Sequence, residues 1–332
     1  LSSHRRTNIT NKLAAKMSHI PVVDFECFHV DNASSVDISN DEVQETSRKL
    51  CDALRTIGFV YLKNHGIRDE EITRLKELYD GFFNLPADVK QKYTLDTKDG
   101  FGYFPYEWEK CNPSRPHGDL KEAFNVIPTK TKLYPNAEVP GIEDGTKLFF
   151  NRACVVARRL LQAIAIGLKL EDPNFFDDYH HVNNPSISNM STVRVLRYPP
   201  LDGTEIKPGQ VRCGEHSDFG SVTLVFQDEV GGLEVRGLDG EYKPATPIPG
   251  TAVVNIGDLM QRWTADQLKS TKHRVMVPLD EEARKRARSS VVFFMVADDD
   301  AVIECIDGSS KYPPSTSKEW VMSEMYKTYQ EL

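Results

Sequence analysis

The sequence has no uninterrupted apolar run of the roughly 18 residues that a membrane-spanning helix needs. It also lacks an excess of positive charge, because 41 Lys and Arg residues stand against 49 Asp and Glu residues, for a net charge of −8. Proteins that wrap nucleic acid or lie on anionic membranes usually carry a basic surface. We therefore expect neither a nucleic-acid nor a membrane partner. Enzymes and binding proteins that act on small molecules remain.

The sequence also lacks a Cys-x-x-Cys pair, the spacing typical of structural zinc sites. Its six cysteines are scattered, and in a chain of 332 residues they are expected to be reduced and mostly buried, as in a cytoplasmic protein. Residues 1–18 contain four basic residues and no acidic one. We expect this segment to be a disordered leader or an expression remnant, with organelle targeting as the alternative.

Helix and strand patterns alternate in residues 19–185. Apolar residues recur at helical spacing over 41–57 and 72–83, and a long, strongly apolar helix is expected over 148–170. Short apolar runs that are typical of strands precede and follow the first of these helices.

From residue 186 to residue 300 the pattern changes to short strands separated by Gly-rich or charged turns. Many short strands without alternating helices indicate a barrel or a two-sheet jelly roll. Thr316 and Glu319 form a capping-box pattern, which predicts a C-terminal helix within 315–332. No internal repeat or linker divides the chain, so we expect a single domain over 19–332.

One group of candidate metal ligands lies in the strand-rich half. His216 and Asp218 precede a predicted strand, and His273 follows 55 residues after Asp218. In extended chain, residues i and i+2 point to the same face, so His216 and Asp218 can both point into a barrel. Two imidazoles and a carboxylate on one face of a metal leave positions open, as in non-haem Fe(II) oxygenases.

The His-x-Asp pattern is not unique to this position. It also occurs at His29 and Asp31, before a polar stretch, and at His117 and Asp119, in a loop rich in Pro and Gly. Neither of these lies in the strand-rich half. On spacing alone, the pattern at 216–218 could still be a surface pair.

A candidate anion-binding group lies further along the chain. Arg288, Ser290 and Phe294 share one face of a predicted strand. A guanidinium beside a hydroxyl is suited to a carboxylate. The alternative is that Arg288 ends the basic run 284–288 on a solvated edge. An inward arginine in so apolar a strand needs a buried anion, which favours the binding role.

Several motifs occur together in a fixed order. The second half contains Tyr198-Pro199, Gly214-Glu-His-Ser-Asp-Phe-Gly220, Val254-Asn-Ile-Gly-Asp258, Ser270-Thr-Lys-His-Arg-Val275 and Arg288-x-Ser290-x-x-Phe-Phe294. The first half contains Ile20-Pro-Val-Val-Asp-Phe25, Gly58-Phe-Val-Tyr-Leu-Lys-Asn-His-Gly66 and Phe82-Phe-Asn-Leu-Pro86. Over about residues 19–330 the chain resembles the iron/2-oxoglutarate-dependent dioxygenases of the isopenicillin N synthase-like group. Its barrel segments look most like thymine-hydroxylase-type members.

The resemblance implies a mainly β fold with flanking helices, in which the long helix braces one sheet of a double-stranded β-helix (jelly roll). It implies Fe(II), with 2-oxoglutarate and O2 as cosubstrates. The implied iron ligands are His216, Asp218 and His273. The implied contacts to the far carboxylate of 2-oxoglutarate are Arg288, Ser290 and Tyr198. The reaction would oxidise a C–H bond of a small molecule by hydroxylation, desaturation or oxidative cyclisation, with release of succinate and CO2.

The substrate contacts that we expect are Phe294, Phe219 and Tyr103, and we expect no catalytic residue beyond the metal ligands. Two other functions stay open at this point. One is an oxidase resembling isopenicillin N synthase, which uses O2 without 2-oxoglutarate, although Tyr198 favours cosubstrate binding. The other is an inactive binding module, against which the intact set of candidate ligands argues. Neither the substrate nor the oligomeric state follows from these residues.

Overall fold

The computed structural model describes residues 20–30, 36–94, 101–128, 130–131 and 133–329. The leader predicted over 1–18 lies outside these residues. The described α-helices are α2 (Asp41–Thr56), α3 (Asp69–Phe83), α4 (Ala87–Gln91), α5 (Ile142–Gly167), α6 (Asp258–Trp263), α7 (Glu281–Arg284) and α8 (Ser317–Tyr329). Two short 3-10 helices are η1 (Glu26–Phe28) and η2 (Asp177–Tyr179).

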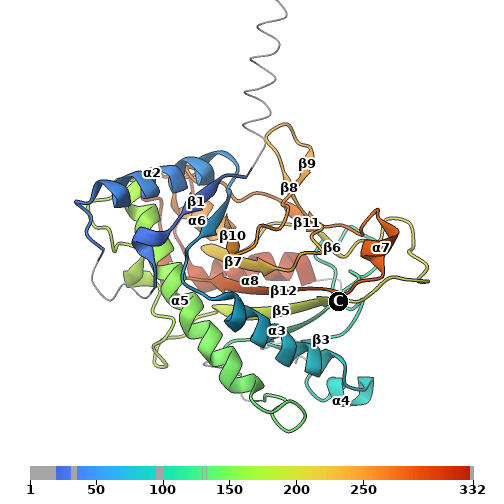
Figure 1. Cartoon of the computed structure of the whole chain (residues 1–332). Helices are drawn as coiled ribbons and strands as arrows, with labels where there is room; N and C mark the ends of the chain where they lie inside the picture. The colour runs from blue at the N-terminus through green and yellow to red at the C-terminus, as the bar shows by residue number, and fades with distance from the viewer. Residues whose placement is uncertain (1–19, 31–35, 95–100, 129, 132, 330–332) are drawn as a thin grey trace, which may run out of the picture.

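Two β-sheets form the centre of the molecule (Figure 1). The larger sheet has the order β1 (Val22–Asp24), β2 (Phe59–Lys63), β10 (Thr251–Ile256), β7 (Val222–Gln227), β12 (Arg288–Met295), β5 (Thr192–Tyr198), β4 (Glu122–Val126) and β3 (Gly102–Phe104). The smaller sheet has the order β6 (Cys213–His216), β11 (His273–Val275), β8 (Leu233–Arg236) and β9 (Tyr242–Pro244). A separate pair joins β13 (Val302–Ile303) and β14 (Ser315–Thr316).

Strand β12 shows how the sequence separates the two faces of the larger sheet. Its residues Val291, Phe293 and Met295 are buried in the hydrophobic core that the sheet shares with the helices. Val292 and Phe294 belong instead to the cluster between the two sheets. This alternation follows from the two-residue period of a strand and gives the sheet two apolar faces. The predicted two-sheet jelly roll is confirmed.

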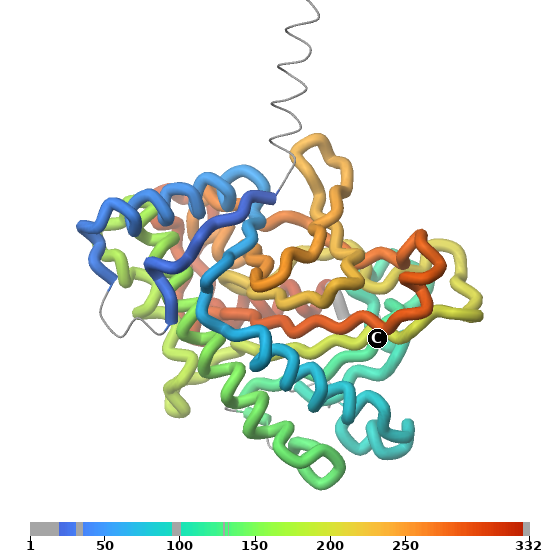
Figure 2. Tube along the Cα trace, viewed as in Figure 1, coloured from blue at the N-terminus to red at the C-terminus, as the bar shows by residue number. Residues whose placement is uncertain are grey.

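Helices α2, α3 and α5 cover the outer face of the larger sheet, and α5 contacts both of the others (Figure 2). Helix α5 begins at Ile142, earlier than the predicted start at residue 148, because its first turn is too polar to show apolar spacing. It ends at Gly167, before the predicted end at residue 170, because Lys169 adopts a φ of 60°. The predicted long bracing helix is therefore confirmed with shifted ends.

Strands from both halves of the chain share the larger sheet. Strand β2 pairs with β10, and β4 pairs with β5. The predicted C-terminal helix is confirmed as α8; residues 330–332 lie outside the described part. Its capping box is formed, because the Thr316 N–H donates to Glu319 Oε2 at 3.1 Å and the Glu319 N–H donates to Thr316 Oγ1 at 3.3 Å.

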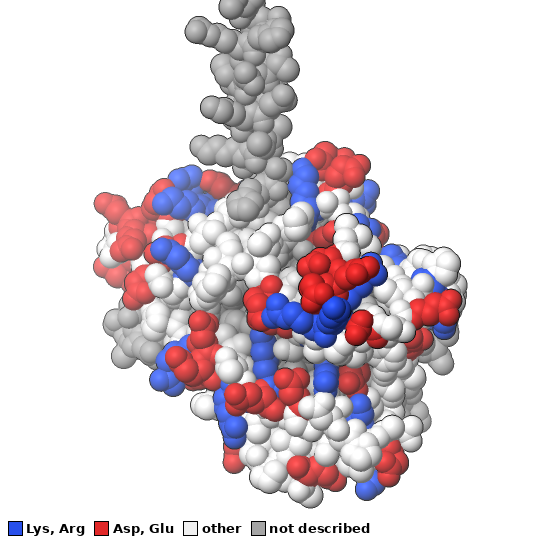
Figure 3. Space-filling model, turned by 45° about the vertical axis from the view of Figure 1, so that its right-hand side comes forward, with Lys and Arg blue, Asp and Glu red and all other residues white. Residues whose placement is uncertain are grey.

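Among the helices that the structure describes, none is long and apolar enough to cross a membrane. On the face shown in Figure 3, acidic and basic side chains are interspersed. That face therefore offers no continuous basic surface of the kind that binds phosphate backbones.

Candidate active site

A cavity lies between the two sheets. Strands β5, β7 and β12 of the larger sheet line it, together with β6 and β11 of the smaller sheet. Val321 and Met325 of α8 also line it, so the C-terminal helix forms part of its wall. The cavity contains the residues that the sequence predicted as metal ligands.

The three predicted metal ligands converge in this cavity. His216 at the end of β6 pairs with His273 on β11, and their ring centroids are 4.3 Å apart. The Nε2 atoms of both histidines lie 3.7 Å from Asp218 Oδ1. One atom from each residue can thus face a common point, as a facial set of two histidines and one carboxylate requires.

Hydrogen bonds orient each of these side chains. The Nδ1–H of His216 donates to the Gly214 carbonyl at 2.8 Å, and the Nδ1–H of His273 donates to the Thr271 carbonyl at 3.2 Å. Because Nδ1 carries the proton, the lone pair of each Nε2 is available to a metal.

The carboxylate of Asp218 is held in a similar way. Its Oδ2 accepts hydrogen bonds from Thr223 Oγ1 at 2.7 Å and from Asn255 Nδ2 at 2.6 Å, which leaves Oδ1 facing the imidazoles. Burial on its own raises the pKa of Asp218. The two nearby imidazoles and these two hydrogen bonds outweigh burial and hold the pKa below its ordinary value. The side chain is therefore a carboxylate, the form that binds a metal.

The other His-x-Asp patterns form no such set within the described residues. The Asp119 carboxylate accepts hydrogen bonds from the Cys111 and Gly214 backbone N–H groups and pairs with Lys121. Asp31 lies outside the described residues. The donor set at 216, 218 and 273 thus fits an iron ion, and the pattern at 117–119 does not.

Arg288 lies in the cavity as the strand alternation predicted. Its side chain is 1% exposed, and its guanidinium lies 4.7 Å from the centroid of the Tyr198 ring. Its Nε donates to the Gly231 carbonyl at 2.6 Å, and its Nη1 lies 3.5 Å from Ser290 Oγ. No carboxylate of the described residues lies within ion-pair distance of it. A buried cation without an acidic partner fits the binding of an anion such as a carboxylate.

The other two arginines of the basic run lie elsewhere. Arg286 forms an exposed ion pair with Glu229. Arg284 ends α7 and donates from Nε to the Pro278 carbonyl at 2.7 Å. Only Arg288 of the three lines the cavity, so the predicted register of β12 is confirmed.

Two of the three predicted substrate contacts line the cavity. Phe294 shares the inner face of β12 with Arg288, and Phe219 follows the metal-ligand segment. Tyr103 does not line it, so that prediction is wrong. The Tyr103 ring packs edge-on against Phe82, and its hydroxyl donates to Glu122 Oε2 at 2.6 Å on the helix side of the sheet.

The sequence did not reveal a group of charged residues in the cavity. Glu109 pairs with Arg194 on β5 and with Lys121, whose Nζ lies 2.9 Å from Glu109 Oε2. All three are buried and line the cavity. Lys121 and the adjacent Glu122 point to opposite faces, because Lys121 pairs with Glu109 whereas Glu122 pairs with Lys90. No local pattern in the sequence indicates this group, because its three members come from separate segments of the chain.

Sequence comparisons place these features among known proteins. The pattern of the family described as "2OG-Fe(II) oxygenase superfamily" matches residues 190–297, and that described as "non-haem dioxygenase in morphine synthesis N-terminal" matches residues 20–141. The chain is 35% identical over 270 residues to "2-oxoglutarate-Fe(II) type oxidoreductase ppzD" of Metarhizium rileyi, covering 74% of each chain. It is 31% identical over 316 residues to "2-oxoglutarate-dependent dioxygenase htyE" of Aspergillus rugulosus, covering 87% and 92%.

Solved structures show the same likeness. Full-length T7H of Neurospora crassa, in complex with alpha-KG and thymine, is similar at a TM-score of 0.80 and 30% identity, covering 93% of this chain and 97% of that one. A putative 2OG-Fe(II) oxygenase family protein of Caulobacter crescentus gives a TM-score of 0.77 at 26% identity, covering 93% and 99%.

Proposed function

Since the chain belongs to the 2OG-Fe(II) oxygenase superfamily, we propose that its cavity is the active site and that the residues described above hold its cofactors. The protein is an oxidoreductase that uses Fe(II), 2-oxoglutarate and O2. The roles of individual residues are our proposal.

His216, Asp218 and His273 hold the iron. The observation that carries this assignment is the position of Asp218 Oδ1, which lies 3.7 Å from both Nε2 atoms while Oδ2 is occupied by hydrogen bonds. When bound there, iron supplies the centre at which O2 oxidises 2-oxoglutarate to succinate and CO2 and the substrate C–H bond is oxidised. The protein's part is to fix the ligands and to keep water from the cavity.

Arg288, Ser290 and Tyr198 hold the far carboxylate of 2-oxoglutarate. The Arg288 guanidinium is buried, has a hydroxyl beside it and rests on an aromatic ring. A carboxylate at this position would form charge-assisted hydrogen bonds with a cation that no described acidic residue neutralises.

The substrate is a small molecule with both an apolar part and a polar group. Phe294, Phe219 and Val292 give the cavity apolar contacts, and the buried ion pair of Glu109 and Arg194 gives it a polar wall. A substrate with a hydrogen-bonding group facing this ion pair would be oriented, because buried polar groups strongly disfavour ligands that leave them unpaired.

Succinate formation in air tests this function. We expect the iron-loaded protein to release succinate from 2-oxoglutarate, and a true substrate to increase that release in step with its own oxidation. A panel of small molecules with and without hydrogen-bonding groups identifies the substrate class. Oxygen consumption and substrate oxidation without any requirement for 2-oxoglutarate would instead indicate an oxidase that resembles isopenicillin N synthase.

A further inference from the structure

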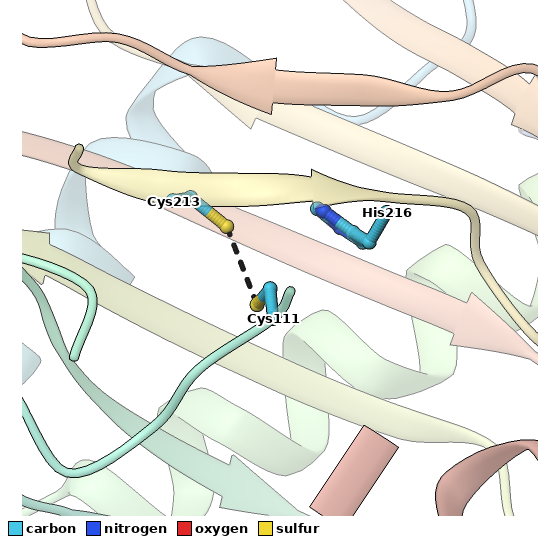
Figure 4. A group of neighbouring side chains, drawn as sticks. All are labelled: Cys111, Cys213 and His216. Atoms are coloured by element: carbon cyan, nitrogen blue, oxygen red, sulfur yellow. Dashed lines mark hydrogen bonds between the residues drawn. The ribbon is translucent and has the colours of Figure 1, made fainter. Parts of the chain in front are cut away.

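Two cysteines and a lysine meet at the wall of the cavity. Figure 4 shows the side chains of Cys111 and Cys213 pointing toward one another. Their Sγ atoms lie 3.5 Å apart, and Lys121 Nζ lies 2.8 Å from Cys111 Sγ and 3.3 Å from Cys213 Sγ. Cys213 lies on β6, whereas Cys111 lies in the loop between β3 and β4. All three line the cavity.

One carboxylate holds the two cysteine-bearing segments together. Asp119 Oδ2 accepts the Cys111 backbone N–H at 3.0 Å, and Asp119 Oδ1 accepts the Gly214 backbone N–H at 2.9 Å. Gly214 directly follows Cys213, so Asp119 fixes the backbones on both sides of the sulfur pair. This arrangement brings the sulfurs close before any reaction, which favours their joining.

We propose that Cys111 and Cys213 form a peroxide-sensitive disulfide in the wall of the proposed active site. A disulfide has an S–S length of about 2.05 Å, so the sulfurs must approach by about 1.5 Å. Cys111 lies in a loop without regular secondary structure, so the loop can supply this movement while β6 stays in place.

The chemistry needs a peroxide as the oxidant. Hydrogen peroxide oxidises the thiol of Cys111, the more accessible of the two, to a sulfenic acid and releases one water. The sulfur of Cys213 then attacks this sulfur, the S–S bond forms, and the sulfenic oxygen leaves as a second water. Two thiols lose two electrons and two hydrogens, and one peroxide is reduced to two waters.

The same sulfurs and His216 could also be considered as three ligands for a metal ion. Two observations favour the disulfide. The ammonium of Lys121 contacts both sulfurs, and Asp119 and Glu109 hold it there, so a second cation would meet a positive charge. In addition, His216 Nδ1 donates to the Gly214 carbonyl, while Nε2 faces Asp218.

The disulfide should inhibit the enzyme, an expectation that rests on the proposed function. Formation of the disulfide draws the loop that carries Cys111 toward β6. The bond is made at Cys213, which lies three residues before His216 in the chain. The loop also carries Glu109 of the polar wall. Oxidation would therefore alter the wall that the substrate meets.

Peptide mapping tests the disulfide independently of activity. The full-length, metal-free protein is treated with hydrogen peroxide, its free thiols are alkylated, and it is digested without reductant. We expect a Cys111–Cys213 linked peptide that dithiothreitol separates. Cys27→Ser is the matched control, because Cys27 is equally half-buried but has no second cysteine beside it in the described structure. It should still give the link, whereas Cys111→Ser should not.

Three results would overturn the proposal: oxidation of each cysteine without a link, a link from Cys111 to Lys121 through oxygen, or protection of both thiols by Zn²⁺ with stoichiometric binding.

Succinate formation supplies the second measurement. After peroxide treatment of the metal-free protein, removal of the peroxide and loading with Fe(II), we expect most of it to be lost, dithiothreitol to restore it, and Cys111→Ser to lose little relative to its own untreated rate. A link without inhibition contradicts the inhibitory role alone, and a link in a protein without any activity contradicts the proposed function.

Discussion

At the scale of single residues, the carboxylate of Asp218 depends on its neighbours. Asn255 and Thr223 both donate to Oδ2, so the other oxygen is directed at the imidazoles. Partners of this kind set the orientation of a metal ligand, and their loss commonly costs 10- to 100-fold in metal affinity.

We therefore expect Asn255→Ala to weaken Fe(II) binding by about 10- to 100-fold. Anaerobic titration with Fe(II) measures the affinity. Asn183→Ala, which removes an exposed asparagine, is the control and should bind iron like the unmodified protein. Equal affinities for both variants would show that Asn255 has no part in orienting Asp218.

Arg288 leads to a second prediction at this scale. Removing one partner of a buried charge-assisted pair usually costs about 3–5 kcal/mol, and each 1.4 kcal/mol is about tenfold. Arg288→Ala should therefore raise the 2-oxoglutarate concentration needed for half-maximal succinate formation by about a hundredfold or more. Arg286→Ala removes an exposed pair and should change it by less than about fivefold. Greater damage in Arg286→Ala would mean that the cosubstrate lies elsewhere.

At the scale of elements, His180 links two segments. It directly follows the 3-10 helix η2, and its ring contacts Ser221, the residue directly before β7. Its Nδ1–H donates to the Phe176 carbonyl at 2.7 Å, and its Nε2 accepts from Ser221 Oγ at 2.9 Å. Burial lowers the pKa of His180 to about 4 from an ordinary value of 6.5. The folded protein thus binds fewer protons than the unfolded chain between these pH values, so stability falls as the pH falls.

This shift predicts that lowering the pH from 7 to 4.5 reduces the free energy of unfolding by about 2 to 3 kcal/mol through His180 alone. Urea unfolding of the unmodified protein and of His180→Gln at both pH values isolates the contribution, because glutamine does not titrate. We expect a smaller pH-dependent loss in the variant. Identical losses would mean that the pKa of His180 is the same in the folded and the unfolded protein.

Helix α8 provides a further test at this scale, because it begins with a capping box and forms part of the cavity wall. Replacing the Thr316 cap with alanine should lower the free energy of unfolding by about 1 kcal/mol. Chemical denaturation measures this change. Thr204→Ala, at an exposed threonine, should leave the stability within about 0.5 kcal/mol. A loss in Thr204→Ala equal to that in Thr316→Ala would contradict the role of the cap.

Elements with a long, regular period could be predicted from the sequence. Strand β12 has eight residues, so the two-residue period of a strand could be followed back from Phe294, and it placed Arg288 on the same face. Tyr103 was misplaced because β3 has only three residues, too few for an alternation to fix the face that its side chain takes.

The charged and thiol groups of the cavity wall could not be predicted in this way. Glu109 and Cys111 come from an irregular loop, and they meet Arg194 and Cys213 only after the sheets have formed. Such contacts between distant segments have no periodic signal in a single sequence.

At the scale of the whole molecule, the two sheets bring together ligands that lie far apart in the chain. His273 comes from β11 of the smaller sheet, whereas Arg288 comes from β12 of the larger one, and the cavity lies between them. The helices on the outer face of the larger sheet give that sheet its second buried face. The cytoplasmic location expected from the cysteines stays a prediction.

The central claim is that His216, Asp218 and His273 form the iron site, and the iron content of the whole protein tests it most directly. The unmodified protein, His216→Ala and His117→Ala would be loaded with Fe(II) without oxygen, freed of excess metal and analysed for iron per chain. We predict one iron per chain in the unmodified protein and in His117→Ala, and a large loss in His216→Ala. Full iron content in His216→Ala, together with a loss in His117→Ala, would contradict the account.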